Sequence, residues 1–228
     1  MGVFVAICAS FVLVAPQRAR ALLKSVKIGH RTVWLLVPAA TPPRGGFPLV
    51  VALHWAGARG KSYVPAWESW YRDARAIVAL PTALGTRWHS ADRHHVLETV
   101  EYVRLHYRVD KRRIYLAGFS RGGSFTYAFG MDEASPFVAV APMAAGLVSV
   151  WQTKRHFDVC IVHGADDRLV RPRRSAWMVP RLRRMGHHVE YFSVRGMGHR
   201  HDPRITPHVF RCLDRRYQQW RRHQRPTS

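Results

Sequence analysis

A glycine-flanked serine is the strongest chemical signal in the sequence. Residues 118–122 read Gly-Phe-Ser-Arg-Gly and follow a predicted strand over 113–117. Small residues two positions before and after Ser120 remove the Cβ clashes that a sharp strand-to-helix turn would otherwise create. Such a turn raises the hydroxyl above the carboxyl end of a sheet, where a helix N-terminus also points its free N–H groups. Ser120 is therefore a candidate nucleophile; the alternative is that it only caps the following helix.

A serine hydroxyl becomes a good nucleophile only beside a base that a third group orients. Two later loops offer these groups, because predicted strands over 159–162 and 189–194 lead into His-Gly-Ala-Asp-Asp and Arg-Gly-Met-Gly-His. His199 is the candidate base, with His201 as its nearest rival. Asp166 and Asp167 compete as the acid. Each of these residues has an ordinary alternative as a turn, cap or exposed loop residue.

The elements around these residues predict a fold in which the carboxyl ends of strands meet. Short apolar runs alternate with amphipathic segments, which is typical of a parallel sheet with helices on both faces. We expect a hairpin over 25–37 and strands over 48–54, 77–80, 113–119, 137–141, 158–162 and 189–194. We expect helices over 67–76, 92–107, 120–131, 173–184 and 206–222. The prediction is an α/β fold with one domain over residues 22–228.

Four stretches of the chain resemble the esterase branch of the α/β-hydrolases. Residues 49–54 with Gly57 resemble a strand that ends in His-Gly-x-Gly, and 107–123 resemble the approach to the nucleophile. Residues 163–170 resemble His-Gly-x-x-Asp-x-x-Val, and 196–199 resemble Gly-x-Gly-His. Polyhydroxybutyrate depolymerases, feruloyl esterase-like enzymes and the phospholipase/carboxylesterase group are the most similar. The resemblance implies the α/β-hydrolase fold, and its spacing implies Asp167 rather than Asp166 as the acid.

An oxyanion site needs two N–H donors beside the nucleophile. The backbone of Arg121 is one candidate, and the resemblance implies the N–H of Ala56 as the other. Trp55 stands where the family usually has glycine, so its side chain would narrow the acyl pocket or shift the Ala56 donor. Trp55 and Trp88 are also candidate substrate-binding residues for a phenolic or polymeric ester. The alternative for both is core and loop packing.

The resemblance implies a serine esterase that forms an acyl-enzyme on Ser120 and needs no metal or cofactor. A small or extended ester in an open cleft is the expected substrate. One alternative is a peptidase or amidase on the same fold. Another is a non-catalytic basic protein that binds anions through a degenerate hydrolase fold.

The charge of the chain is strongly positive, with 36 Lys and Arg against 14 Asp and Glu and a net charge of +22. No nucleic-acid-binding motif accompanies this charge, so we expect no specific nucleic-acid partner. The arginines over 171–184 and 211–225 are predicted to lie on solvated helix faces, with Trp177 and Trp220 among the residues that face the core. Attraction to anionic surfaces would be a side property.

The N-terminus and the cysteines bear on location. An uncharged apolar run over 3–15 precedes Ala-Arg-Ala at 19–21, which predicts a signal peptide over 1–21 and a secreted or periplasmic protein. The alternative is a cytoplasmic protein, in which the apolar run is an N-terminal strand or results from a start codon placed inside a longer gene. No segment predicts a membrane span. Cys160 and Cys212 could pair in an oxidising compartment, but a buried free thiol is the expectation for Cys160.

Overall fold

The computed structural model describes residues 21–74, 76–147 and 153–223. The predicted signal peptide lies outside the described residues except for Ala21, which begins the first strand. Within the described part of the chain, no helix has both the length and the apolar character needed to cross a membrane.

Eight strands form one sheet in the order β1-β2-β4-β3-β5-β6-β7-β8. The first two strands run antiparallel, β2 pairs with β4 antiparallel, and all later neighbours are parallel. This is the predicted mostly parallel sheet. The strands are β1 (Ala21–Ile28), β2 (Arg31–Pro38), β3 (Phe47–Leu53), β4 (Ile77–Leu80), β5 (Val109–Phe119), β6 (Ala139–Met143), β7 (Asp158–Gly164) and β8 (His188–Val194). The α-helices are α1 (Gly60–Ala74), α2 (Asp92–His106), α3 (Arg121–Gly130), α4 (Arg173–Arg184), α5 (Thr206–Leu213) and α6 (Arg215–His223).

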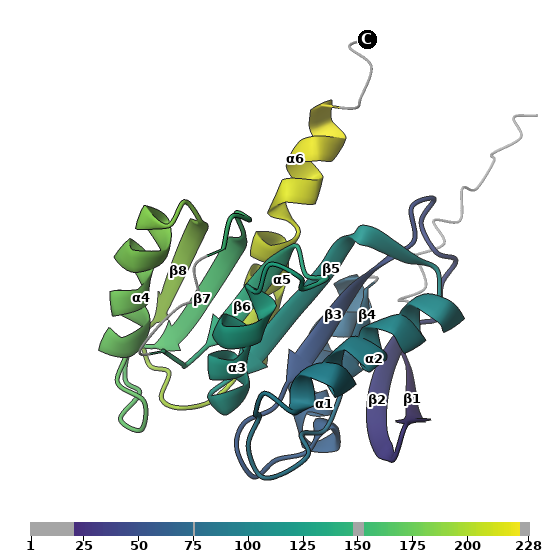
Figure 1. The fold of residues 1–228 in the computed structure, drawn as a ribbon, viewed down its shortest axis with the longest axis horizontal. Helices are drawn as coiled ribbons and strands as arrows, with labels where there is room; N and C mark the ends of the chain where they lie inside the picture. The colour runs from purple at the N-terminus through teal and green to yellow at the C-terminus, as the bar shows by residue number, and fades with distance from the viewer. Residues whose placement is uncertain (1–20, 75, 148–152, 224–228) are drawn as a thin grey trace, which may run out of the picture.

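Helices cover both faces of the sheet (Figure 1) because its central strands are apolar on both sides. Successive side chains of a strand point to opposite faces. Leu49, Val51 and Leu53 of β3 therefore join one core with residues of α2, α3 and α4. Val50 and Ala52 join a second core with residues of α1 and α5. The uninterrupted apolar run of β3 is explained by this double burial.

Helix α1 begins at Gly60, seven residues before the predicted start. Pro65 lies inside the helix and removes one backbone donor, which is a local signal against a helix at this position. The early turns are held by burial, because Tyr63, Val64 and Trp67 pack in the core that covers β3 and β4. Burial of three large side chains outweighs the local signal of the proline.

The helix predicted over 206–222 is two helices that meet at Asp214. Asp214 is buried and accepts hydrogen bonds from Arg113 Nε at 2.7 Å and from the Tyr115 hydroxyl at 2.6 Å. Helix α6 then extends away from the sheet (Figure 1) and has no buried residue.

Two tryptophans were wrongly predicted to face the core. Trp220 of α6 is 41% exposed and lies against the guanidinium of Arg112, because α6 has no sheet to pack on. Trp177 of α4 is 52% exposed. Met178, Val179 and Leu182 supply the buried face of α4 instead.

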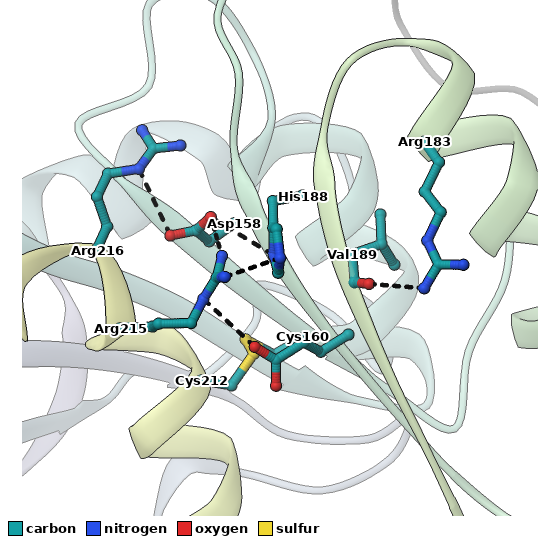
Figure 2. The surroundings of a disulfide bond; sticks show 9 residues. Asp158, Cys160, Arg183, His188, Val189, Cys212, Arg215 and Arg216 are labelled. Atoms are coloured by element: carbon teal, nitrogen blue, oxygen red, sulfur yellow. Dashed lines mark hydrogen bonds and ion pairs between the residues drawn. A yellow bond between two sulfur atoms is a disulfide. The ribbon is translucent and has the colours of Figure 1, made fainter. Parts of the chain in front are cut away.

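A disulfide joins Cys160 of β7 to Cys212 of α5 (Figure 2), so the expectation of a free thiol at Cys160 is wrong. Both residues belong to the core between the sheet and α5, and their Cα atoms are 6.0 Å apart. The start of α6 is tied to the same strand, since Arg215 donates to Asp158 at 2.8 Å. The disulfide and this ion pair fix the last two helices to the sheet.

Candidate active site

Ser120 lies at a strained turn between β5 and α3. Its φ is +56°, a left-handed conformation that non-glycine residues rarely adopt. A Cβ on Gly118 would come within 2.3 Å of the Gly122 carbonyl oxygen, and one on Gly122 within 2.3 Å of the Leu53 carbonyl oxygen. The turn therefore requires both glycines. The Ser120 hydroxyl makes no capping hydrogen bond to α3, which contradicts the alternative that the serine serves only as a helix cap.

The structure brings Ser120, His199 and Asp167 into one hydrogen-bonded line. His199 follows β8, and its Nε2 is 3.0 Å from Ser120 Oγ. Its Nδ1 is 2.7 Å from Asp167 Oδ2. Asp167 follows β7 and is buried, whereas Asp166 is exposed to solvent. These three residues follow the carboxyl ends of β5, β7 and β8, which lie at the same edge of the parallel part of the sheet.

The carboxylate of Asp167 is held from several sides. Oδ1 accepts hydrogen bonds from the backbone N–H of Leu169 at 2.9 Å and of Val170 at 2.8 Å. Burial alone would raise the pKa of Asp167, but the hydrogen bonds from His199 and Val170 outweigh burial and lower its pKa. Asp167 is thus ionised at neutral pH, and its Oδ2 is directed at His199.

His163 is a buried neighbour of Asp167, and its contact with the acid was not predicted from the sequence. Its Nε2 lies 2.7 Å from the Val170 carbonyl oxygen and 3.2 Å from Asp167 Oδ2. Its Nδ1 lies 2.6 Å from Ser175 Oγ, which donates to the Ala145 carbonyl oxygen. His163 therefore connects the acid loop to α4. The signal was present, since His163 opens the His-Gly-x-x-Asp pattern.

His201, the rival base, is engaged elsewhere. Its Nδ1 is 2.6 Å from the Tyr63 hydroxyl, and its Nε2 is 2.9 Å from Thr206 Oγ1. Thr206 donates its own hydrogen to the Ala66 carbonyl oxygen, so His201 Nε2 carries the proton and Nδ1 accepts from Tyr63. Burial lowers the pKa of His201 to about 4. The ring is therefore neutral, and both of its nitrogens are hydrogen-bonded to residues other than Ser120.

The loop after β3 contains Ala56, one of the two candidate oxyanion donors, and is held in place by His54. Burial lowers the pKa of His54, so the ring is neutral. Its Nε2 accepts from the Ala83 N–H at 3.1 Å, so its Nδ1 donates to the Trp55 carbonyl oxygen at 2.7 Å. Ala56 lines the same cleft as Ser120. Arg121 is the first residue of α3, so its N–H has no intrahelical acceptor.

Trp55 fits this loop without backbone strain. Among the described non-glycine residues only Ser120 and Ala144 have a positive φ, so Trp55 has a backbone conformation open to any residue. Its ring lies edge-on to Tyr63 at 5.7 Å and to Phe119 at 6.2 Å between centroids. The side chain is 36% exposed and forms part of the cleft wall. The large side chain at position 55, where the sequence resemblance implies glycine, therefore forms part of the cleft wall.

Trp88 lies outside the Ser120 cleft. Its ring is buried, 4.9 Å from the His54 ring, and its Nε1 donates to the His54 carbonyl oxygen at 2.8 Å. The contact of Trp88 with the site is therefore through the backbone of the loop that contains Ala56.

The cleft above Ser120 has a volume of about 540 Å³. Its apolar lining comes from Trp55, Ala56, Pro65, Ala66, Phe119, Leu169 and Pro203, and its polar lining from Ser62, Ser120, His199, Arg200 and His201. Within the described ranges, no three His, Cys, Asp or Glu residues are grouped so as to hold a metal ion.

The chain matches no protein-family model. It is 29% identical to feruloyl esterase C of Emericella nidulans over 133 residues, which are 54% of this chain and 49% of the relative. It is 26% identical over 147 residues to a bifunctional acetylxylan esterase/xylanase of Neocallimastix patriciarum, covering 60% of this chain and 21% of that protein. The chain spans about half or less of the length of these curated relatives.

A solved structure gives the fold. The S-formylglutathione hydrolase of Staphylococcus aureus superimposes with a TM-score of 0.67 over 88% of this chain and 98% of that one, at 16% identity. That likeness concerns the fold alone. The chain therefore has the α/β-hydrolase fold, and the curated proteins to which its sequence is similar are esterases.

Proposed function

We propose that the chain is a serine hydrolase that cleaves carboxylic esters through an acyl-enzyme on Ser120. The observation that carries this proposal is the unbroken line of hydrogen bonds from Ser120 Oγ through His199 to the buried carboxylate of Asp167. A hydroxyl, an imidazole and a carboxylate in this order are the parts that nucleophilic acyl transfer needs. Similarity to feruloyl and acetylxylan esterases supports an ester as the substrate.

In the first half-reaction, Ser120 Oγ attacks the ester carbonyl carbon while His199 Nε2 takes the hydroxyl proton. Asp167 stabilises the imidazolium that forms, and the backbone N–H groups of Ala56 and Arg121 stabilise the oxyanion. The tetrahedral intermediate collapses, and His199 returns the proton to the leaving alcohol oxygen.

In the second half-reaction, His199 removes a proton from a water molecule that attacks the acyl carbon. The new intermediate breaks its bond to Ser120 Oγ, which recovers its proton from His199. A carboxylic acid and the free enzyme are the products. The balance of atoms requires only ester and water.

The cleft favours an ester with an apolar or aromatic group next to the reacting carbonyl. Trp55, Phe119 and Leu169 form an apolar wall beside Ser120. Aromatic rings bury large apolar area and pack edge-on against such walls. The open cleft would admit a small ester or the end of an extended one.

The test is labelling with a fluorophosphonate probe, together with turnover of p-nitrophenyl butyrate. We expect labelling and turnover in the wild type and neither in Ser120→Ala. Ser193→Ala, an exposed serine on β8 away from the cleft, is the matched control and should keep both. A folded wild type that neither labels nor turns over ester would overturn the proposal. Faster cleavage of the corresponding p-nitroanilide would identify an amidase instead.

We also propose that the chain is exported. The support is the apolar run over 3–15 followed by Ala-Arg-Ala, together with the disulfide between Cys160 and Cys212, since disulfides persist in oxidising compartments. Mass spectrometry of the protein recovered from its native host is the measurement. A mature N-terminus near Leu22 is expected, and an intact Met1 would contradict export.

A further inference from the structure

A second cleft lies on the other side of the nucleophile turn. Its volume is about 570 Å³, close to that of the Ser120 cleft. The two clefts approach each other at the nucleophile turn, because Ser120 lines one and the next residue, Arg121, lines the other. Trp88 lines the second cleft and donates to the carbonyl oxygen of His54, two residues before Ala56 of the first. A group of an ester bound at Ser120 that extended past Arg121 would enter the second cleft.

The interior of the second cleft is aromatic. Trp88 packs against Phe125 at 5.7 Å, and Phe125 packs against Phe129 at 5.3 Å, between ring centroids. The three rings are buried and come from the loop before α2 and from α3. A flat or apolar part of a ligand would be held here by contact with the rings.

The rim of the second cleft carries one unneutralised positive charge. Arg93 lies over the Phe129 ring at 5.0 Å and is paired with Asp132 at 2.9 Å. Arg121 is exposed and, among the described residues, has no acidic partner within ion-pair distance. Among the described residues that line the cleft, Asp132 is the only acidic one, so this part of the lining has an excess of positive charge. Arginine is the side chain best suited to hold a carboxylate.

We propose that this second cleft binds an anionic group of the ester substrate through Arg121, with the apolar body of that group on Trp88 and Phe125. The inference rests on the proposed esterase function of Ser120, because it assigns the substrate class of that same site. It predicts a preference for esters that carry a carboxylate a few atoms from the reacting carbonyl, over esters in which that carboxylate is blocked.

The test compares kcat/KM for paired probes. p-Acetoxybenzoate and its methyl ester differ by one charge on the alcohol side, and p-nitrophenyl hydrogen glutarate and its methyl ester differ by one charge on the acyl side. We expect the charged member to be preferred in one pair, which also shows which side of the ester occupies the cleft. Arg121→Gln should lower that preference by about fivefold, the usual effect of one partly exposed ion pair.

The control separates the cleft from the general positive charge of the protein. Arg184→Gln removes the same charge from an exposed position on α4 that lines neither cleft. Its preference should equal that of the wild type. No preference in either pair, or equal losses in the two variants, would overturn the proposal. Turnover of the neutral esters, with fluorophosphonate labelling, reports separately on the esterase function.

Discussion

Replacing Asp167 by Asn gives the sharpest test of the hydrogen-bonded line, because the structure fixes which way the new amide must point. Two backbone N–H groups, of Leu169 and Val170, donate to Oδ1. The amide oxygen of Asn must take that position, since an NH₂ group there would face two donors. The amide nitrogen then replaces Oδ2, 2.7 Å from His199 Nδ1, and donates to it. His199 is left with its proton on Nε2, facing Ser120, and cannot accept the hydroxyl proton.

The expected loss is large. A wrong tautomer of the base, together with loss of the charge that stabilises the imidazolium, lowers kcat by about 10³- to 10⁴-fold in a serine triad. That corresponds to about 4 to 5 kcal/mol in the activation barrier. The assay is the kcat of p-nitrophenyl butyrate hydrolysis, with thermal unfolding measured on the same samples to verify that the variant is folded.

Asp166→Asn is the matched control. The neighbouring carboxylate is exposed, and the same chemical change there should alter kcat by less than about twofold, as for most surface substitutions. The reasoning is refuted if folded Asp167→Asn keeps more than a tenth of the wild-type kcat. It is also refuted if Asp166→Asn causes the larger loss.

Three further results are expected. Cys212→Ser should lower the free energy of unfolding by about 4 kcal/mol, because the disulfide closes a separation of 52 residues; dithiothreitol should destabilise the wild type by a similar amount and leave the variant unchanged in denaturant titrations. The depressed pKa of His201, about 4, means that the unfolded chain binds the proton first, so stability should fall as pH drops from 6.5 to 4; His201→Gln should remove up to about 3 kcal/mol of that fall, and identical pH curves would contradict it. Trp55→Ala should open the cleft and raise the ratio of kcat/KM for p-nitrophenyl octanoate over acetate by about tenfold, and an unchanged ratio would mean that the ring does not limit the acyl group.

The fold was predictable because its signals are local. Buried parallel strands are apolar on both faces, so runs such as β3 stand out. Ser120, Asp167 and His199 each lie within five residues after the end of a predicted strand. Their order then predicts that Ser120, Asp167 and His199 meet at one edge of the sheet, and the distances agree with that.

The features that escaped prediction depend on partners distant in sequence. The break between α5 and α6 at Asp214 depends on Arg113, which is 101 residues away. The disulfide required knowing that α5 packs on β7, and the early start of α1 required knowing which side chains the sheet would bury around Pro65. Local patterns carry no information on such contacts.

The left-handed backbone conformation of Ser120 lowers the stability of the folded state at the residue that is proposed to act as nucleophile. A non-glycine residue at φ +56° costs the folded state on the order of 1 kcal/mol or more, and glycine would adopt that conformation freely. Replacing the proposed nucleophile by glycine would therefore give an inactive protein whose folded state is more stable. Selection for heat resistance alone would favour glycine at this position, so engineering this protein for thermostability requires that every round of selection also test for ester turnover.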